Sequence, residues 1–200
     1  VNFTSAFNVT QTVGHGLSST PEMIIIKATG VTSNWYVWTK DLTSGNSLAL
    51  NLTRAQNTDL SFTVNANNFT TNWTNSSYEY IAYCFHSVEG YSKIGSYTGN
   101  GSTDGPFIYT GFRPAFVMIK NASAVEDWVI VNTETDTYNV TDKTLKPNSS
   151  QAEIVSTVSS MDIVSNGIKL RTADTKVNGN GHTVIYMAFA EQPFKYANAR

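Results

Sequence analysis

Pro114-Ala-Phe-Val-Met-Ile-Lys120 is an apolar run that opens with a proline and closes with a lysine, and the fold prediction starts from it. The same pattern stands 93 residues earlier, in Pro21-Glu-Met-Ile-Ile-Ile-Lys27. Continuous apolar runs of this length are typical of strands that are covered on both faces. Because two such strands share their first and last residues, the sequence predicts two copies of one β unit.

Further matches extend this repeat along the chain. Trp35 corresponds to Trp128, again 93 residues apart. Two later matches are Phe69 with Ile168, 99 residues apart, and Tyr80-Ile-Ala82 with Tyr186-Met-Ala188, 106 residues apart. The spacing only grows, so we expect the same strand order with longer loops in the second copy. The predicted repeats are residues 1–92 and 93–200, which are also compatible with packing as one continuous unit.

The predicted fold class is all-β, with two tandem β-sandwich-like repeats of antiparallel strands and little or no helix. Short alternating segments such as Ser47-Leu-Ala-Leu-Asn-Leu52 are typical of half-exposed strands. Asn166-Gly167 is the strongest hairpin signal in the chain. Only residues 151–159 carry a weak helical pattern.

The composition argues against several classes of partner. Charged residues make up 14% of the chain and the net charge is -2, without a Lys/Arg cluster, so we expect no nucleic-acid binding. No apolar run is long enough for a membrane span, and we expect no membrane insertion. The single Cys84 allows no internal disulfide. Ten Asn-x-Ser/Thr sequons are interpreted as a by-product of a composition rich in Asn, Ser and Thr, and whether any is glycosylated stays open.

The sequence carries no pattern of reaction chemistry. It has no Gly-x-Ser-x-Gly elbow, and its glycine-rich segment lacks the end of a phosphate loop. His15, His86 and His182 are isolated, without metal-ligand spacing. We therefore expect no catalytic residue, no metal and no cofactor. Two carboxylates brought together by the fold would still allow glycoside cleavage, so this alternative stays open.

The aromatic residues are the better candidates for function. Tyr36, Trp38 and Trp73 have no counterpart in the second copy, so the repeated scaffold does not require them. We predict these three as binding or interface residues, because aromatic faces suit sugar stacking and subunit contacts, with ordinary packing as the alternative. The predicted structural core contains the matched residues Trp35, Trp128, Pro21 and Pro114.

Several motifs resemble a known family. They are Gly14-His-Gly-Leu17, Val88-Glu-Gly-Tyr-Ser-Lys-Ile-Gly-Ser-Tyr-Thr-Gly-Asn-Gly101, Gly111-Phe-Arg-Pro-Ala-Phe-Val-Met-Ile-Lys120 and Met187-Ala-Phe-Ala-Glu-Gln-Pro-Phe-Lys-Tyr-Ala-Asn-Ala-Arg200. Together they resemble an uncharacterised domain near the C-terminus of virion structural and tail-fibre-like proteins of marine tailed phages, including cyanophages. The resemblance implies a non-enzymatic module on the virion exterior, cut from a longer chain.

In that setting we expect a homo-oligomer, a trimer or higher, that contacts other virion proteins. The leading hypothesis is a tail-fibre or appendage module for attachment to host-surface glycans. One alternative is a capsid decoration protein with a purely structural role. The other is a polysaccharide depolymerase on the fibre.

Overall fold

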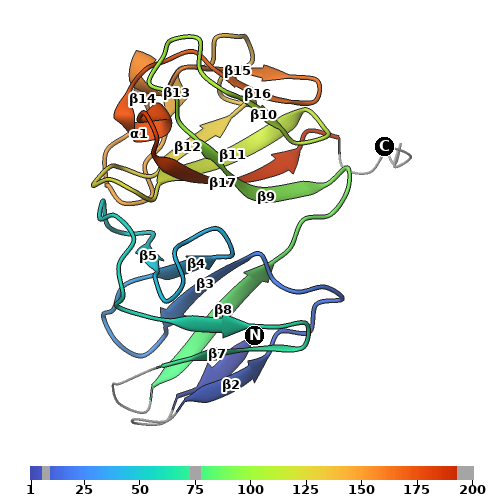
Figure 1. The fold of residues 1–200 in the computed structure, drawn as a ribbon, viewed down its shortest axis with the longest axis vertical. Helices are drawn as coiled ribbons and strands as arrows, with labels where there is room; N and C mark the ends of the chain where they lie inside the picture. The colour runs from blue at the N-terminus through green and yellow to red at the C-terminus, as the bar shows by residue number, and fades with distance from the viewer. Residues whose placement is uncertain (6–9, 73–77, 193–200) are drawn as a thin grey trace. The chain divides into compact units, whose positions relative to one another are not determined.

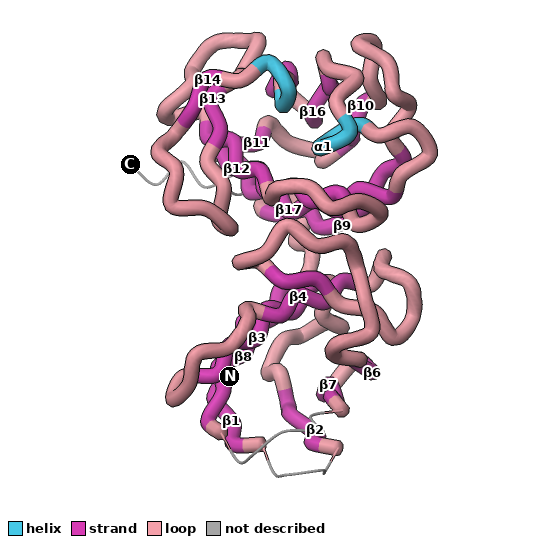
Figure 2. The backbone as a smooth tube through the Cα atoms, turned by 90° about the vertical axis from the view of Figure 1, so that its left-hand side faces the viewer, coloured by secondary structure: helices cyan, strands magenta, loops and turns pink. Residues whose placement is uncertain are grey.

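The computed structural model describes residues 1–5, 10–72 and 78–192. The chain divides into two compact units, Val1–His86 (unit 1) and Ser87–Arg200 (unit 2) (Figure 1), whereas the repeat spacing placed the junction after residue 92. The all-β class with antiparallel sheets is confirmed. In the described residues the helices are one turn each, η1 (Thr157–Ser159) and α1 (Thr175–Asn178), drawn in cyan in Figure 2.

Unit 1 contains a five-stranded sheet in the order β1-β8-β3-β4-β5 and a three-stranded sheet in the order β2-β7-β6. Its strands are β1 (Asn2–Thr4), β2 (Gln11–Gly14), β3 (Met23–Ala28), β4 (Tyr36–Thr39), β5 (Leu48–Ala49), β6 (Phe62–Val64), β7 (Asn68–Thr71) and β8 (Glu79–Phe85). One apolar cluster draws residues from both sheets, among them Ile24, Ile26, Phe69 and Ala82. The two sheets therefore enclose a core of their own.

Unit 2 contains a four-stranded sheet in the order β12-β11-β17-β9, a three-stranded sheet in the order β10-β16-β15, and the short pair β13-β14. Its strands are β9 (Ser92–Thr98), β10 (Phe107–Tyr109), β11 (Pro114–Asn121), β12 (Val129–Asn132), β13 (Lys143–Thr144), β14 (Ile154–Val155), β15 (Met161–Val164), β16 (Gly167–Leu170) and β17 (Thr183–Ala190). A second apolar cluster joins its two larger sheets, among them Val117, Val131, Ile163 and Ile168.

The two units share one pairing scheme. β3 lies between β4 and β8, and β11 lies between β12 and β17. The three-stranded sheets correspond as well, since β2-β7-β6 has the order of β10-β16-β15. In both units the central apolar strand pairs antiparallel with its neighbours on each side. The duplication seen in the sequence is therefore present in the topology.

The register corrects one of the sequence matches. Met23 pairs with Phe85, and its counterpart Phe116 pairs with Phe189, so the last strands correspond at a spacing of 104 residues and not 106. A shift of two residues leaves every side chain on the same face of a strand. The alternation of apolar residues could not distinguish the two alignments for this reason.

The correspondence extends to single hydrogen bonds. Lys27 Nζ donates to the carbonyl oxygens of Ala28 at 2.7 Å and Val31 at 3.1 Å. Lys120 Nζ donates to those of Asn121 at 2.7 Å and Ala124 at 3.2 Å. Each lysine thus holds the loop that follows its strand through the carbonyls one and four residues later.

The predicted core residues have different outcomes. Pro21 and Pro114 are buried, and Trp128 is 1% exposed. Trp35 is 36% exposed, so its placement in the core was wrong. The backbone N–H groups of the two tryptophans do match, because that of Trp35 donates to an Asn51 side chain at 2.9 Å and that of Trp128 to Asn148 at 2.8 Å. The repeat specifies the path of the backbone, but it does not specify which atoms cover a side chain.

Candidate functional site

The aromatic residues predicted to bind a partner lie mostly inside unit 1. Tyr36 and Trp38 are half-buried and pack against its apolar cluster, where the Trp38 ring lies 6.1 Å from the Phe62 ring. Their counterparts in unit 2 are the buried Val129 and Val131. The structure therefore gives these two aromatics a packing environment. Trp73 lies outside the described residues.

A different aromatic pair is exposed, on the outer face of the sheet β10-β16-β15. Phe107 is 47% exposed and Tyr109 is 63% exposed, whereas Ile108 between them is buried. This is the alternation of a strand with one face in the core and one in solvent. Phe107 is in register with Lys169 of β16, which pairs in turn with Asp162 of β15.

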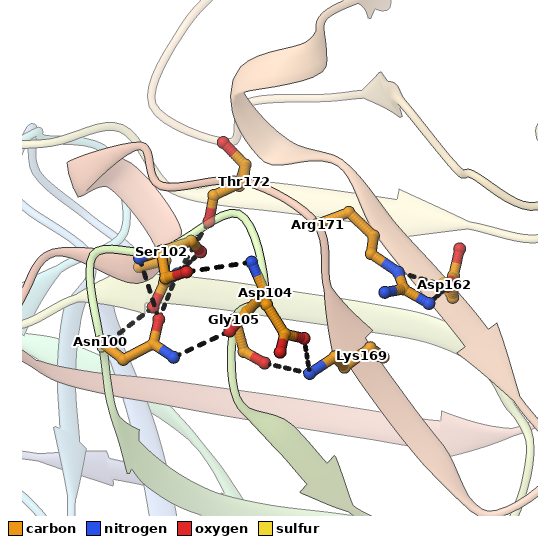
Figure 3. Close-up of polar contacts among 9 residues, drawn as sticks. Asn100, Ser102, Asp104, Gly105, Asp162, Lys169, Arg171 and Thr172 are labelled. Carbon is orange, nitrogen blue, oxygen red and sulfur yellow. Dashed lines mark hydrogen bonds and ion pairs between the residues drawn. The ribbon is translucent and has the colours of Figure 1, made fainter.

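We call this surface the aromatic–charged face and define it by Phe107, Tyr109, Asp162, Lys169 and Arg171, together with Asp104 from the loop before β10. Two ion pairs occupy it, Lys169 Nζ with Asp104 Oδ1 at 2.6 Å and Arg171 Nη2 with Asp162 Oδ2 at 2.6 Å (Figure 3). Arg171 Nε also donates to Asp162 Oδ2 at 2.6 Å. The hydrogen bond from Lys169 lowers the pKa of Asp104, so this carboxylate is ionised at neutral pH.

Gly167 allows the Phe107 ring to lie on this face. A Cβ atom at position 167 would stand 2.9 Å from Cε2 and Cζ of that ring and 2.2 Å from the carbonyl oxygen of Ile108. Both separations are shorter than carbon and oxygen atoms tolerate, so a side chain here is excluded. The absence of a side chain lets the aromatic ring cover the backbone of its neighbouring strand.

The loop that carries Asp104 is fixed by one buried amide. Asn178 is fully buried, and its Nδ2 donates to Asn100 Oδ1 at 3.0 Å and to the carbonyl oxygens of Ser102 and Thr172 at 2.8 and 2.7 Å. Its Oδ1 accepts from the Asn100 N–H at 2.8 Å. Asn178 thereby ties residues 100–102 to the segment before α1. Asp104, at the end of the same loop, lies beside Lys169 (Figure 3).

Unit 1 has no such surface on the matching sheet. The strand pairing aligns Phe107 with Thr12 and Tyr109 with Gly14, each 95 residues earlier. It likewise aligns Lys169 with Thr70 and Asp162 with Thr63. These positions in unit 1 are uncharged and carry no aromatic ring, so the shared scaffold does not require the aromatic–charged face.

The sequence already contained the signal for this face. Phe107-Ile-Tyr109 has no aromatic counterpart in the first copy, the same criterion that selected Tyr36 and Trp38. The sequence comparison found the matches around the tryptophans but not the alignment of this strand with Thr12 and Gly14. That alignment depends on the pairing between β2 and β7, which the apolar pattern does not show.

The face offers stacking and hydrogen bonding. The exposed rings of Phe107 and Tyr109 can pack against an apolar face of a bound ligand. The charged groups beside them can form hydrogen bonds with hydroxyl groups of the same ligand. In the part of the chain that the structure describes, no group of three or more His, Cys, Asp and Glu residues is placed to hold a metal ion. Among the same residues, no helix has the length and apolarity to cross a membrane.

Comparison with known proteins places the chain in a family. A model of a domain of unknown function, DUF7483, matches residues 1–193. No curated protein and no solved structure matches the chain. Because the match covers both units almost completely, this chain belongs to the DUF7483 family.

Proposed function

We propose that this protein is a non-catalytic attachment module on the exterior of a tailed-phage particle, and that it binds host-surface glycans through the aromatic–charged face. One observation carries the binding proposal. Phe107 and Tyr109 are exposed on one face of a strand, where the matching strand of unit 1 has Thr12 and Gly14. Two exposed rings on the same face of one strand form a small apolar patch that the shared scaffold does not require, and such patches often mark ligand or interaction sites.

The chemistry of the face fits a sugar. A sugar ring presents apolar C–H groups on its faces and hydroxyl groups around its edge. The C–H groups pack against the π face of an aromatic ring. The hydroxyl groups form hydrogen bonds with carboxylate oxygens and with guanidinium or ammonium N–H groups. Phe107 and Tyr109 supply the first type of contact, and the ion pairs of Lys169 and Arg171 supply the second.

The phage setting is proposed from the resemblance to tail-fibre-like proteins in the glycine-rich and terminal motifs. Proteins on the outside of a particle are present in many copies, and linked copies gain avidity over a single site. A small, open face of this kind suits that mode of binding, because each site needs only a weak affinity.

The state of Asp104 supports binding without cleavage. A glycosidase needs a carboxyl group whose pKa is raised, so that it can donate a proton near neutral pH. The pKa of Asp104 is shifted the opposite way by the hydrogen bond from Lys169. Asp162 is held by two bonds from Arg171. Both carboxylates of the face are thus engaged as partners of cations.

The test is binding of the 200-residue chain to host cells and to an array of cell-surface glycans. Phe107→Ala and Tyr109→Ala are each expected to weaken glycan binding at least tenfold, which corresponds to about 1.4 kcal/mol. Thr12→Ala, at the matching position of unit 1, is the control and should leave binding unchanged. Binding that survives both aromatic substitutions, or release of reducing ends from the glycan, would contradict the proposal.

A further inference from the structure

We infer that the aromatic–charged face selects uncharged glycans over acidic ones. This inference depends on the proposed function and names the class of ligand. It starts from the charges that surround the two aromatic rings. The face carries two cations, Lys169 and Arg171, and two carboxylates, Asp104 and Asp162, so its own formal charges cancel.

Each cation of the face is already paired. Lys169 Nζ contacts Asp104 Oδ1 at 2.6 Å and donates to the Gly105 carbonyl oxygen at 2.5 Å. Arg171 directs both Nε and Nη2 to Asp162 Oδ2. A ligand carboxylate would therefore meet a cation whose charge is already offset by a partner carboxylate, so it would gain little net attraction. The carboxylates Asp104 and Asp162 would also repel a ligand carboxylate that approaches the same cations.

The paired carboxylates still have acceptor capacity. An ionised carboxylate offers about four lone-pair sites, and each ion pair uses only part of them. Asp104 is open to solvent, with 84% of its side chain exposed. Sugar hydroxyl groups can donate to these oxygens without disturbing the ion pairs. A uronic or sialic acid carboxylate near the same oxygens would be repelled.

The two aromatic rings suit a chain of sugars. Phe107 and Tyr109 are two residues apart on one strand, which separates their Cα atoms by about 6.6–6.8 Å. This separation is comparable with the length of one sugar unit, so neighbouring units of one glycan can each contact a ring. Since the ring of Phe107 lies over Gly167, it forms a flat surface on the sheet.

The experiment compares neutral polymers (a glucan, a mannan and a galactan) with acidic ones (polygalacturonate, alginate and polysialic acid) on the 200-residue chain. We expect at least one neutral polymer to bind tenfold more tightly than any acidic one, with the same affinity at low and at physiological salt. Phe107→Ala should abolish that preference together with the binding.

A second variant tests the role of the ion pairs directly. Asp104→Asn removes the partner of Lys169 and should raise the affinity for acidic polymers several-fold, in a salt-dependent manner. Glu134→Gln makes the same change in net charge at an exposed position that is not part of the face, and should leave both affinities unchanged. Circular dichroism of each variant checks that the fold is retained.

The outcomes separate the two proposals. Phe107-dependent binding that favours acidic polymers would overturn the inference and leave the attachment function standing. Binding to none of the polymers, and to no host cell, would overturn both. A preference for neutral polymers that Asp104→Asn does not reduce would show that the ion pairs do not set the selectivity, and would also overturn the inference.

Discussion

Lys120 is fully buried at the end of β11, where its ammonium group holds the following loop through the Asn121 and Ala124 carbonyl oxygens. Burial lowers its pKa to about 8, because the charge loses contact with water. The unfolded chain keeps the ordinary value of 10.5. Between these two values the unfolded state holds a proton that the folded state has released. The free energy of unfolding therefore contains a component that rises with pH from about 8 to 10.5.

We predict that the stability of the native chain relative to Lys120→Met increases between pH 7 and pH 10. The component is about 1.4 kcal/mol for each unit by which the two pKa values differ. Urea unfolding of both proteins at several pH values measures the difference in their free energies of unfolding. In this difference, the contributions of all other titrating groups cancel, because both proteins contain them. Lys27→Met, which removes the matching loop contacts from a half-buried position, is the control. A difference that stays constant over this pH range would contradict the burial effect.

At the scale of the element, the loop of residues 99–105 depends on the short helix α1, which lies about 70 residues later in the chain. Asn178 closes α1 and makes four hydrogen bonds to residues that lie before β10 and before α1. Asp174 caps the first turn of α1 by accepting from the Lys176 N–H. One helical turn would be marginal in isolation, so the bonds of Asn178 stabilise the loop and the turn together.

Asn178→Ala is expected to cost about 2–4 kcal/mol, since it removes four side-chain hydrogen bonds, of which one is buried and three are part-buried. The Asn100 N–H, which donates to Asn178 Oδ1, should lose protection from hydrogen exchange, and so should the Gly101 N–H, which donates to the Asn178 backbone carbonyl that the loosened loop would release. Asn180→Ala changes the same residue type at an exposed position two residues later and should cost less than about 0.5 kcal/mol. Equal losses in the two variants would mean that Asn178 does not hold the loop.

Strand-level structure shows where the sequence was informative. The apolar runs and the hairpin around Asn166 predicted β15 and β16, although the turn consists of Ser165 and Asn166 while Gly167 begins β16. α1 was missed because four residues are too few to show a helical period. Alternation of apolar residues reports the face of a strand and not its register. The sequence therefore identified β17 as the counterpart of β8 but aligned the two strands two residues out of register.

The candidate site was less predictable than the fold. Trp38 and Phe107 are both aromatic residues that one copy lacks, and the sequence treats them alike. Only the packing distinguishes them, since Trp38 is placed against the core of unit 1 and Phe107 lies on an outer face above a glycine. Asp162 and Lys169, which lie beside Phe107 on this face, come from β15 and β16, more than 50 residues later in the sequence.

At the scale of the whole molecule, the chain has two copies of one scaffold but only unit 2 carries the aromatic–charged face. The described positions of unit 1 that match Phe107, Tyr109 and Lys169 are Thr12, Gly14 and Thr70. Duplication has thus provided two similar sheets, of which one has aromatic and charged residues and the other has small polar ones. The proposed function consequently implies a single glycan site in each chain.

We therefore expect one ligand site for each 200-residue chain, and not two. Isothermal titration with a short neutral oligosaccharide measures this number, at protein concentrations well above the dissociation constant. Phe107→Ala should remove all of the binding heat and Thr12→Ala none of it. If half of the sites survive Phe107→Ala, unit 1 also binds the sugar.

With one site in each chain, linking several chains on a scaffold should raise the apparent affinity for a glycan-coated surface by a factor of about 10²–10⁴, because rebinding takes place within the same assembly.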